Sequence, residues 1–329
     1  MRAVQAGAFG APAVLTVVEL PDPTPGLGEI AIDVTHSAVG LIDVYLRQGA
    51  YRDRPGMPQP PFTLGLEVAG TVRELGPGVT GFTVGEKVVS MSAGSGTGGY
   101  ASVYVAPVRG VISIEGYDVD PALAVSVIPN AAMAHVALTR VAHLVSGESV
   151  LVHGALGGFA AAFPGIATRL GASRVVGSVR AGRLEAAHAT RLPYDEIVDS
   201  ERLPDVLGDE KFDVIIDPVG GDVRTRSLGL MRPGSRLVVA GNASGDWGHQ
   251  LASNEIWGAS ITVAGFNAGA FLPTHAEFMR PALEAARDSA VAGLGDIAID
   301  VLPFSQAQRA HERMESRSLD GRIVLTPSE

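Results

Sequence analysis

The sequence has no cysteine among its 329 residues. This absence excludes disulfide bonds, cysteine nucleophiles and zinc sites built from thiolate ligands. Lysine occurs only as Lys87 and Lys211, so almost all positive charge is arginine. The formal net charge is −10, from 25 basic and 35 acidic residues. Because phosphate backbones are bound by clustered cations, we expect no nucleic-acid partner.

Aromatic residues make up only 5% of the chain, against 46% apolar residues, so the apolar content is mostly small and branched aliphatic side chains. The most apolar window, residues 122–138, is interrupted by Pro129, Asn130 and His135. We expect it to be too short and too polar to span a bilayer, and we expect no membrane partner. No basic-then-apolar leader follows Met1, so a cytoplasmic location is expected.

The length predicts two domains. The first third of the chain is rich in β-prone runs separated by proline- and glycine-rich turns, and these runs are 14–20, 29–38, 67–75, 87–91 and 100–106. The tail is expected to return to strand, helix and strand, over 301–304, 306–317 and 322–325. A tail this short cannot form its own core, so it should pack on the first domain. We therefore predict one discontinuous domain, 1–122 with 291–329, and a second domain at 123–290.

The middle of the chain alternates helical segments with continuous apolar runs. Such runs fit strands buried on both faces of a parallel sheet. Six of them with intervening helices predict an α/β, doubly wound Rossmann domain. The runs are 149–153, 174–179, 196–199, 212–218, 236–240 and 261–266.

A glycine-rich turn follows the first run and precedes a helix expected to reach Leu170, with a bend at Pro164. Strand, turn and helix in this order are the setting of a dinucleotide fingerprint, because glycines let the backbone approach a pyrophosphate. A purely structural tight turn is the alternative. The predicted cofactor-binding residues here are Gly154, Gly157, Gly158, Phe159 and Ala160.

The second run ends without the acidic residue that would hold the ribose 2′-hydroxyl of NAD, since no Asp or Glu occurs from Val175 to Gly182. Ser178, Arg180 and Arg183 offer a hydroxyl and two cations for a 2′-phosphate instead. NADPH is therefore the expected cofactor. The alternative is that both arginines are ordinary solvated residues at a helix start.

Short segments spread over nearly the whole chain resemble, in order and spacing, the zinc-independent quinone oxidoreductases of the medium-chain dehydrogenase/reductase superfamily, the group that includes zeta-crystallin. The matching segments are 42–51, 65–70, 85–88, 147–155, 217–221, 233–238 and 321–325. The resemblance implies a GroES-like β-barrel domain beside the Rossmann domain. It also implies NADPH in the crevice between them, a quinone or α,β-unsaturated carbonyl substrate, and a homodimer paired near Ile261.

Some positions depart from the family pattern. Leu66 stands where zinc alcohol dehydrogenases of the superfamily have a histidine ligand, and no metal site is expected. Gly40 replaces a common Asn, Met133 a common Thr, and His135 a common Tyr or Trp; Ser200 replaces a Tyr. The first two replacements remove polar groups from the expected reaction site. A nucleotide-binding protein without redox activity and an enoyl reductase of a biosynthetic pathway therefore stay open as alternatives.

The resemblance supplies the catalytic candidates Tyr45, Arg47 and His135. The Tyr45 phenol would bind a substrate oxygen or donate a proton, and His135 would act as an acid near neutral pH. Arg47 would reach a cofactor phosphate or an acidic substrate, or hold its loop through a carboxylate such as Asp43. Purely structural roles are the alternative for each residue. The resemblance also assigns to the cofactor Gly241, Phe266 and Arg322.

Overall fold

The computed structural model describes residues 1–92, 98–316, 319 and 321–328. The chain divides into two compact units. The first contains Met1–Pro129, Leu272–Val291 and Ala298–Glu329, and the second contains Asn130–Phe271 and Ala292–Ile297. A domain is a part of the chain that folds on its own, which is more than a compact unit. The predicted domain limits, 1–122 with 291–329 and 123–290, therefore stay a prediction.

The second unit is built on one parallel sheet of six strands. Its order is β11-β10-β9-β12-β13-β14, so the first strand in sequence is central and the chain winds outward on either side of it. This is the strand order of two joined mononucleotide-binding halves. The strands are β9 (Ser149–His153), β10 (Arg174–Val179), β11 (Glu196–Asp199), β12 (Phe212–Asp217), β13 (Met231–Val239) and β14 (Thr262–Gly265).

The α/β prediction is confirmed, and burial explains it. Every residue of β9 is buried, and β12 is nearly so, as strands covered on both faces require. β13 begins earlier than expected because Met231 already pairs with Phe212, before a shift in register. Leu151, Ile215 and Leu237 of three neighbouring strands belong to one apolar cluster, which forms the core of this unit.

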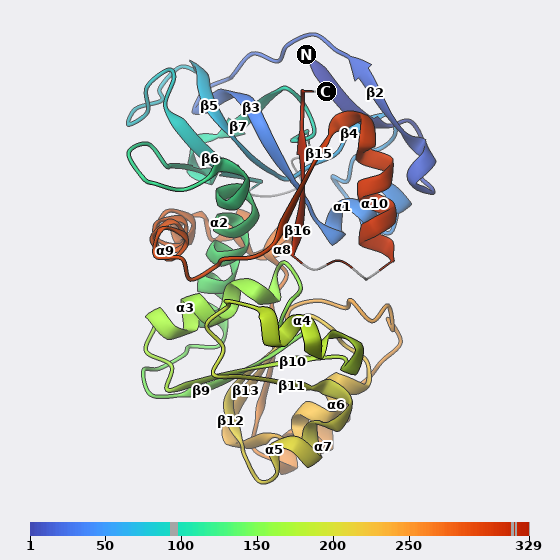
Figure 1. The fold of residues 1–329 in the computed structure, drawn as a ribbon, viewed down its shortest axis with the longest axis vertical. Coiled ribbons are helices and arrows are strands. Elements are labelled where there is room, and N and C mark those ends of the chain that lie inside the picture. Colours follow the sequence, from blue (N-terminus) through green and yellow to red (C-terminus); the bar gives the residue numbers. More distant parts are fainter. Residues whose placement is uncertain (93–97, 317–318, 320, 329) are drawn as a thin grey trace. The chain divides into compact units, whose positions relative to one another are not determined.

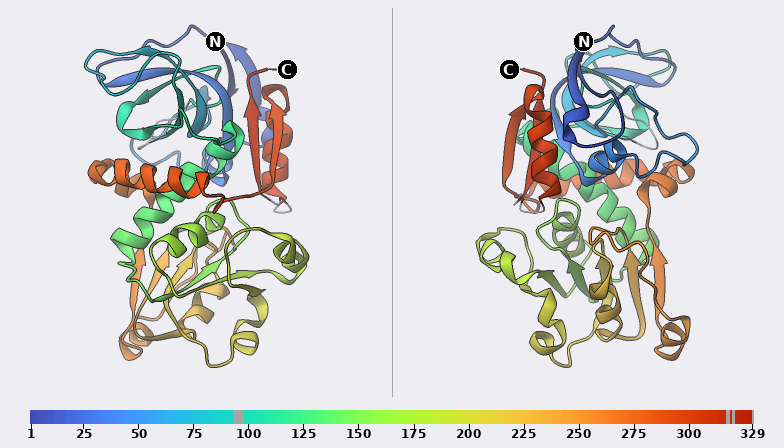
Figure 2. Two further views of the ribbon diagram at one scale, coloured as in Figure 1. Left: turned by 60° about the vertical axis from the view of Figure 1, so that its left-hand side comes forward. Right: turned by 90° about the vertical axis from the view of Figure 1, so that its right-hand side faces the viewer.

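Short helices cover both faces of the parallel sheet, as Figures 1 and 2 show. Two of them follow the first two strands, α3 (Phe163–Arg169) and α4 (Leu184–Ala189). Three more lie on the opposite face, α5 (Leu203–Leu207), α6 (Asp222–Leu228) and α7 (Ser253–Gly258). Ligands bind sheets of this kind at the carboxyl ends of the strands.

The first unit contains two sheets. One has the order β15-β16-β3-β5-β6-β8, with β7 also paired to β3, and the other has the order β2-β1-β4. This β structure separate from the parallel sheet agrees with the predicted fold class. Its strands are β1 (Arg2–Ala6), β2 (Leu15–Glu19), β3 (Glu29–Val39), β4 (Phe62–Thr63), β5 (Glu67–Leu75), β6 (Lys87–Met91), β7 (Val103–Pro107), β8 (Val111–Ser113), β15 (Ile299–Pro303) and β16 (Arg322–Thr326).

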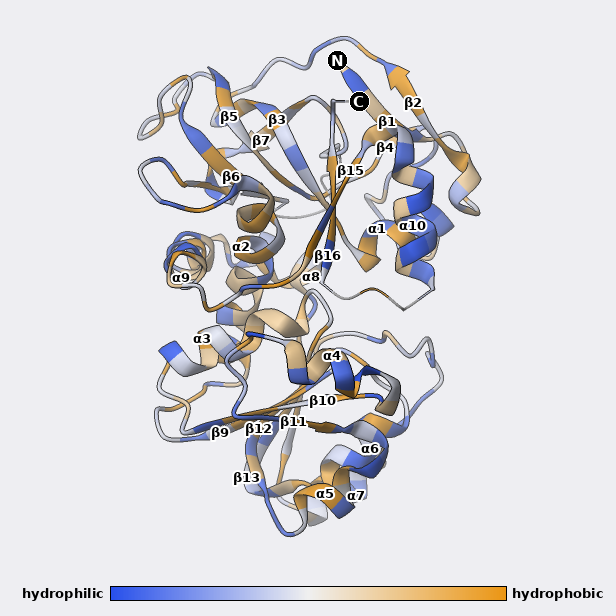
Figure 3. Ribbon diagram, in the orientation of Figure 1, coloured by the Kyte–Doolittle hydropathy of each residue, from blue (hydrophilic) through white to orange (hydrophobic). Residues whose placement is uncertain are grey.

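The C-terminal tail is joined to the first part of the chain by backbone pairing. β16 runs antiparallel to β3, with Val324 opposite Ala38, and parallel to β15. Between them, α10 (Ala307–Glu315) is mostly hydrophilic along its length (Figure 3) but buries Ala307, Ala310 and His311. The tail therefore contributes both a strand and an apolar helix face to this unit.

The apolar segment at residues 122–138 was expected to be too short and too polar to span a bilayer, and the structure differs from this expectation. α2 (Pro121–Val136) contains Pro129 and continues as a π-helical turn (Ala137–Val141), so the helical segment is long and apolar enough to cross a membrane. Of its most apolar window, however, 78% is buried inside the protein, as in a core helix. The other helices are α1 (Leu41–Gln48), α8 (Ala268–Phe271) and α9 (Met279–Val291).

Candidate active site

The glycine-rich turn begins directly after β9. Gly154 has a φ of +68°, in the left-handed region, and a Cβ there would lie 3.1 Å from the Val219 side chain. The Gly157 amide donates to the Gly154 carbonyl at 2.7 Å, which closes the turn. Glycine at position 154 is therefore required by backbone conformation, because L side chains are strained there.

The outer part of this turn exposes backbone donors. The Ala161 amide donates to the Gly157 carbonyl at 2.8 Å, but within the described part of the chain the amides of Gly158 and Phe159 have no hydrogen-bond partner. Two consecutive N–H groups without acceptors, in a turn that opens a helix, suit an anion.

The helix after the turn differs from the expected one. A 3-10 turn (Ala160–Ala162) comes first, and α3 then begins at Phe163. Pro164 lies in the first turn of α3, where its missing N–H would have had no partner within the helix. Ala162 and Phe163 both have right-handed helical dihedrals, so the 3-10 turn passes directly into α3.

The structure gives Ser178 a different role from the predicted contact with the cofactor phosphate. Its side chain is fully buried, and its Oγ lies 2.7 Å from Nδ1 of His153. The other ring nitrogen of His153 lies 2.8 Å from Oγ of Ser227 in α6. Burial lowers the pKa of His153 to about 4, so the ring is neutral near pH 7. The Ser178 hydroxyl is thus engaged beneath the turn, and we reassign Ser178 from a phosphate contact to a support of the strand ends.

The two arginines lie directly after β10, at the edge of the sheet where the glycine turn lies. Arg180 is exposed and Arg183 is half-buried. The neighbouring acid is Asp199, opposite Val179 in the register of β10 and β11, and its carboxylate accepts the Glu201 amide at 2.9 Å. Both arginines therefore lie beside the C-terminal end of β10.

Gly241 lies at the same edge, in the segment after β13. A Cβ on Gly241 would lie 2.8 Å from the Pro218 carbonyl oxygen, so only glycine fits there. Asp217 organises the loop: its carboxylate accepts the amides of Val219 and Gly220, each at 2.8 Å, and Nε of Arg224 at 2.6 Å. Arg224 in turn donates to the Gly241 carbonyl at 2.8 Å. Asp217 thus has the structural role that holds two loops together.

Phe266 follows β14, so a third predicted contact lies at the carboxyl edge of the sheet. Its side chain is buried, with its ring centroid 5.9 Å from that of Phe271 in a T-shaped pair. Its amide donates to the Val239 carbonyl at 2.9 Å. The structure therefore brings together the glycine turn, the arginines, Gly241 and Phe266 at one edge of one sheet.

Tyr45 lies on α1 in the first unit. It is half-buried, and its ring makes a T-shaped contact with Tyr51 at 6.3 Å between centroids. The start of α1 is held by Asp43, whose carboxylate accepts the amides of Gly40 at 2.8 Å and Gly65 at 3.2 Å. Burial raises the pKa of Asp43 to about 7. Asp43 thereby ties the helix that carries Tyr45 to the turn at Gly65.

Arg47 has a different role from the one expected. Its side chain is fully buried and pairs with Glu315 of α10, which also accepts a hydrogen bond from Gln48 at 2.9 Å. Its guanidinium therefore neither pairs with Asp43 nor reaches solvent, where a phosphate would bind. We reassign Arg47 from the catalytic group to the link between α1 and α10.

The role predicted for Arg322 also changes, because its side chain, like that of Arg47, is buried in an ion pair. It is only 6% exposed, and it forms an ion pair with Glu67 of the neighbouring β5. Burial raises the pKa of Glu67, and Arg322 partly offsets that rise. The buried Arg322 guanidinium is already engaged by a carboxylate of the neighbouring strand, so Arg322 is reassigned from cofactor binding.

His135 lies on the part of α2 that belongs to the second unit. The side chain is half-buried, and burial together with Arg140 lowers its pKa. The ring is therefore a weaker candidate for an acid near pH 7 than an exposed histidine would be. Its backbone carbonyl accepts the Thr139 hydroxyl at 2.7 Å.

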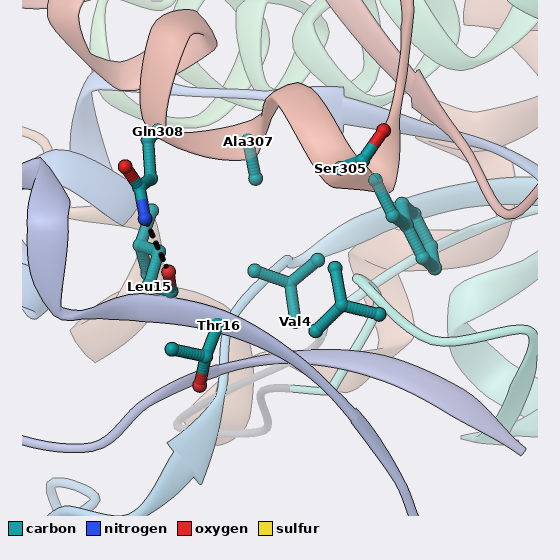
Figure 4. A pocket seen from close by; sticks show the side chains of 8 residues that line it. Val4, Leu15, Thr16, Ser305, Ala307 and Gln308 are labelled. Carbon is teal, nitrogen blue, oxygen red and sulfur yellow. Dashed lines mark hydrogen bonds between the residues drawn. The ribbon is translucent and has the colours of Figure 1, made fainter. Parts of the chain in front are cut away.

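A separate hollow lies in the first unit, between β2 and the start of α10. It has a volume of about 250 Å³, and Figure 4 shows Gln308 bonded across its edge to the Leu15 carbonyl at 2.8 Å. Its wall is mainly apolar, lined by Val4, Leu15, Thr16, Val17, Phe304, Ser305, Ala307 and Gln308. These lining residues include none of the candidates from the sequence.

Two side chains in the site were missed by sequence reasoning. His153 ends a buried strand directly before the glycine turn, and a polar residue in that position was a usable signal. Tyr194, in the connection to β11, bonds two carbonyls of the turn, and no local pattern in the sequence points to it.

Comparison with known proteins covers most of the chain. Residues 26–116 match the family described as alcohol dehydrogenase GroES-like domain, and residues 192–325 match the family described as zinc-binding dehydrogenase. Within the described ranges, no group of three or more His, Asp or Glu side chains is placed to hold a metal ion.

Individual relatives agree with these matches. Quinone oxidoreductase 1 of Escherichia coli (strain K12) is 31% identical, with 97% of each chain covered. A 2-haloacrylate reductase of Burkholderia sp is 30% identical, covering 68% of this chain and 67% of that protein. The crystal structure of Escherichia coli quinone oxidoreductase complexed with NADPH has a TM-score of 0.86 at 26% identity, covering 99% of this chain and 100% of that one.

Proposed function

The chain belongs to the zinc-independent quinone oxidoreductase family of the medium-chain dehydrogenase/reductase superfamily and is an oxidoreductase, and from this premise we propose that it transfers hydride from NADPH to a quinone or an α,β-unsaturated carbonyl compound. The observation that carries the cofactor assignment is the turn after β9, where the Gly158 and Phe159 amides have no hydrogen-bond partner among the residues that the structure describes. A relative of the same fold that was solved with NADPH supports the assignment.

The pyrophosphate is bound by the backbone of Gly154, Gly157, Gly158, Phe159 and Ala160. Its negative charge would supply the acceptor that the Gly158 and Phe159 amides lack among the described residues. Gly241 and the backbone at Phe266 line the nicotinamide half, because both follow strands at the same edge of the sheet.

Arg180 and Arg183 select NADPH over NADH. Both follow the C-terminal end of β10, and no Asp or Glu occurs from Val175 to Gly182. Guanidinium groups bind phosphate through charge-assisted hydrogen bonds, which are about twice as strong as neutral ones.

The chemistry divides between cofactor and protein. NADPH supplies a hydride to an electrophilic carbon of the conjugated substrate. The Tyr45 phenol binds the substrate oxygen and donates its proton as negative charge develops there, and water then reprotonates Tyr45. Tyr45 carries the proton-donor role, and His135 is the second candidate.

Of the two alternative functions, an enoyl reductase and a nucleotide-binding protein without redox activity, we favour the first, which reduces an activated alkene. The 2-haloacrylate reductase among the relatives is named for an activated alkene, which accepts hydride at carbon as an enone does. An enoyl reductase of a biosynthetic pathway would differ only in its substrate. A nucleotide-binding protein without redox activity is favoured only by Gly40 and Met133, where the family commonly has polar side chains.

The protein works in the cytoplasm as a homodimer. β14 is the last strand of its sheet, with β13 as its one neighbour among the described strands, and its residues are at most half-buried. A second copy pairing along this edge would satisfy the backbone groups that the edge leaves open. Sedimentation equilibrium distinguishes monomer from dimer directly.

NADPH oxidation with a panel of quinones and a panel of enones tests the function. We expect turnover with at least one panel, and a lower rate with NADH at the same concentration. NADPH binding without oxidation in either panel would favour the protein without redox activity. Absence of NADPH binding would overturn the proposal.

A further inference from the structure

Tyr194 contacts both sides of the glycine-rich turn. It lies in the connection between α4 and β11, and its hydroxyl oxygen is 3.2 Å from the Ala155 carbonyl oxygen and 3.1 Å from the Ala160 carbonyl oxygen. Ala155 begins the turn after Gly154, and Ala160 begins the helical segment after it. One phenol therefore spans the stretch that contains the unpartnered amides of Gly158 and Phe159.

The position of Tyr194 is determined by its neighbours in the sheet. The next residue, Asp195, is bound to Val175 of β10 twice, by its amide at 2.8 Å and by its carboxylate at 2.6 Å. Gly177 of β10 then provides space for the ring, since a Cβ there would lie 3.2 Å from Cδ1 of Tyr194 and 2.7 Å from Cβ of Ala155. The ring thus packs against β10 and reaches the turn.

The phenol acts as a donor at every working pH. Burial raises the pKa of Tyr194 well above its usual value, so the hydroxyl keeps its proton. Both partners are carbonyl oxygens, which can only accept, and a single O–H at these two distances shares its proton between them. Few other bonds restrain the turn from that side; one is the Ala155 amide to the Ser178 carbonyl at 3.0 Å.

We propose that Tyr194 is a positioning residue of the dinucleotide site, and that its hydroxyl holds the turn in the conformation that leaves the Gly158 and Phe159 amides available to the pyrophosphate. This inference rests on the proposed function. It goes beyond that function because it assigns a role to a residue that acts through the backbone carbonyls of Ala155 and Ala160.

The test compares Tyr194→Phe with the wild type and with Tyr104→Phe. The Phe variant keeps the ring in its space and removes only the bond to the two carbonyls. Tyr104 is a buried tyrosine of the first unit and serves as a matched control for the loss of one phenol. Three quantities are measured: the NADPH dissociation constant, kcat with its KM for NADPH, and hydrogen exchange of residues 155–161 without cofactor.

We expect Tyr194→Phe to raise the NADPH dissociation constant and KM about fivefold, with kcat at saturation unchanged, which matches the loss of one neutral hydrogen bond. Exchange at 155–161 should quicken in that variant and not in Tyr104→Phe. An NADPH dissociation constant within twofold of the wild type, or unchanged exchange in the turn, would overturn the inference. If the wild type binds no NADPH, the proposed function fails, while the exchange measurement still decides whether Tyr194 holds the turn.

Discussion

Nδ1 of His153 accepts a hydrogen bond from the Ser178 hydroxyl across 2.7 Å, directly beneath the glycine turn. The direction follows from the other side of the ring. The Ser227 hydroxyl donates to the Val223 carbonyl at 2.7 Å, so it must accept from Nε2–H of His153 at 2.8 Å. The neutral Nε2–H tautomer therefore joins β9, β10 and α6 through one side chain.

The first prediction concerns stability in acid. The pKa of His153 is lowered from 6.5 to about 4 in the folded protein, so between these values the unfolded chain binds more protons. Stability is then lost as pH falls through this window, because protonation takes the lone pair that Ser178 binds. Between pH 7.5 and 5 the His153 contribution to the free energy of unfolding falls by about 2 kcal/mol.

Urea unfolding at both pH values measures this loss, with His153→Asn as the comparison. Asn keeps a donor and an acceptor but does not titrate, so the variant should lose about 2 kcal/mol less than the wild type over the same interval. His311, whose pKa is lowered to about 3, contributes equally to both proteins and cancels. Equal losses in wild type and variant would contradict the prediction.

The second prediction concerns the proton donor. Replacing Tyr45 with Phe removes the phenol and keeps the ring against Tyr51, so kcat for a quinone or enone should fall by about tenfold or more. Steady-state kinetics measures it. Tyr117→Phe is the control, since Tyr117 is 40% exposed and its ring contact with Arg287 survives the change. An unchanged kcat in Tyr45→Phe would remove this residue from the mechanism.

The third prediction concerns cofactor choice. The double change of Arg180 and Arg183 to Ser should raise KM for NADPH at least tenfold, because charge-assisted hydrogen bonds to the 2′-phosphate are lost. KM for NADH should change little. Arg169→Ser removes one positive charge from an exposed position on α3 and should affect neither. A similar rise for NADH would mean that the arginines act elsewhere on the cofactor.

The fourth prediction separates a structural from a catalytic Arg47. Glu315→Ala leaves the Arg47 guanidinium buried without a charged partner, and its Nε and Nη1 atoms already lack hydrogen bonds in the described part of the chain. The free energy of unfolding should fall by about 3 kcal/mol, with KM for NADPH unchanged. Asp53→Ala breaks the exposed pair with Arg52 and should cost less than about 1 kcal/mol. A normal stability in Glu315→Ala would refute the structural assignment.

Much of the second unit was predictable because its signals are local. Continuous apolar runs located the parallel strands, and the glycines after His153 marked the turn. Pro164 predicted a bend, but the 3-10 turn before α3 was not predicted, since it depends on which residue of α3 the proline occupies. The length of the helical segment through Val141 was underestimated because surrounding protein, which the sequence alone does not describe, buries its apolar surface.

The order of residues by itself determined the fold class, the glycine turn and the positive charges after β10, since each depends on backbone conformation or on neighbours along the chain. Only the tertiary structure decided which polar side chains are already engaged. Arg47, Ser178 and Arg322 have their partners far away in sequence, at Glu315, His153 and Glu67. Buried polar groups must find partners wherever folding brings them, and no local pattern specifies that distance.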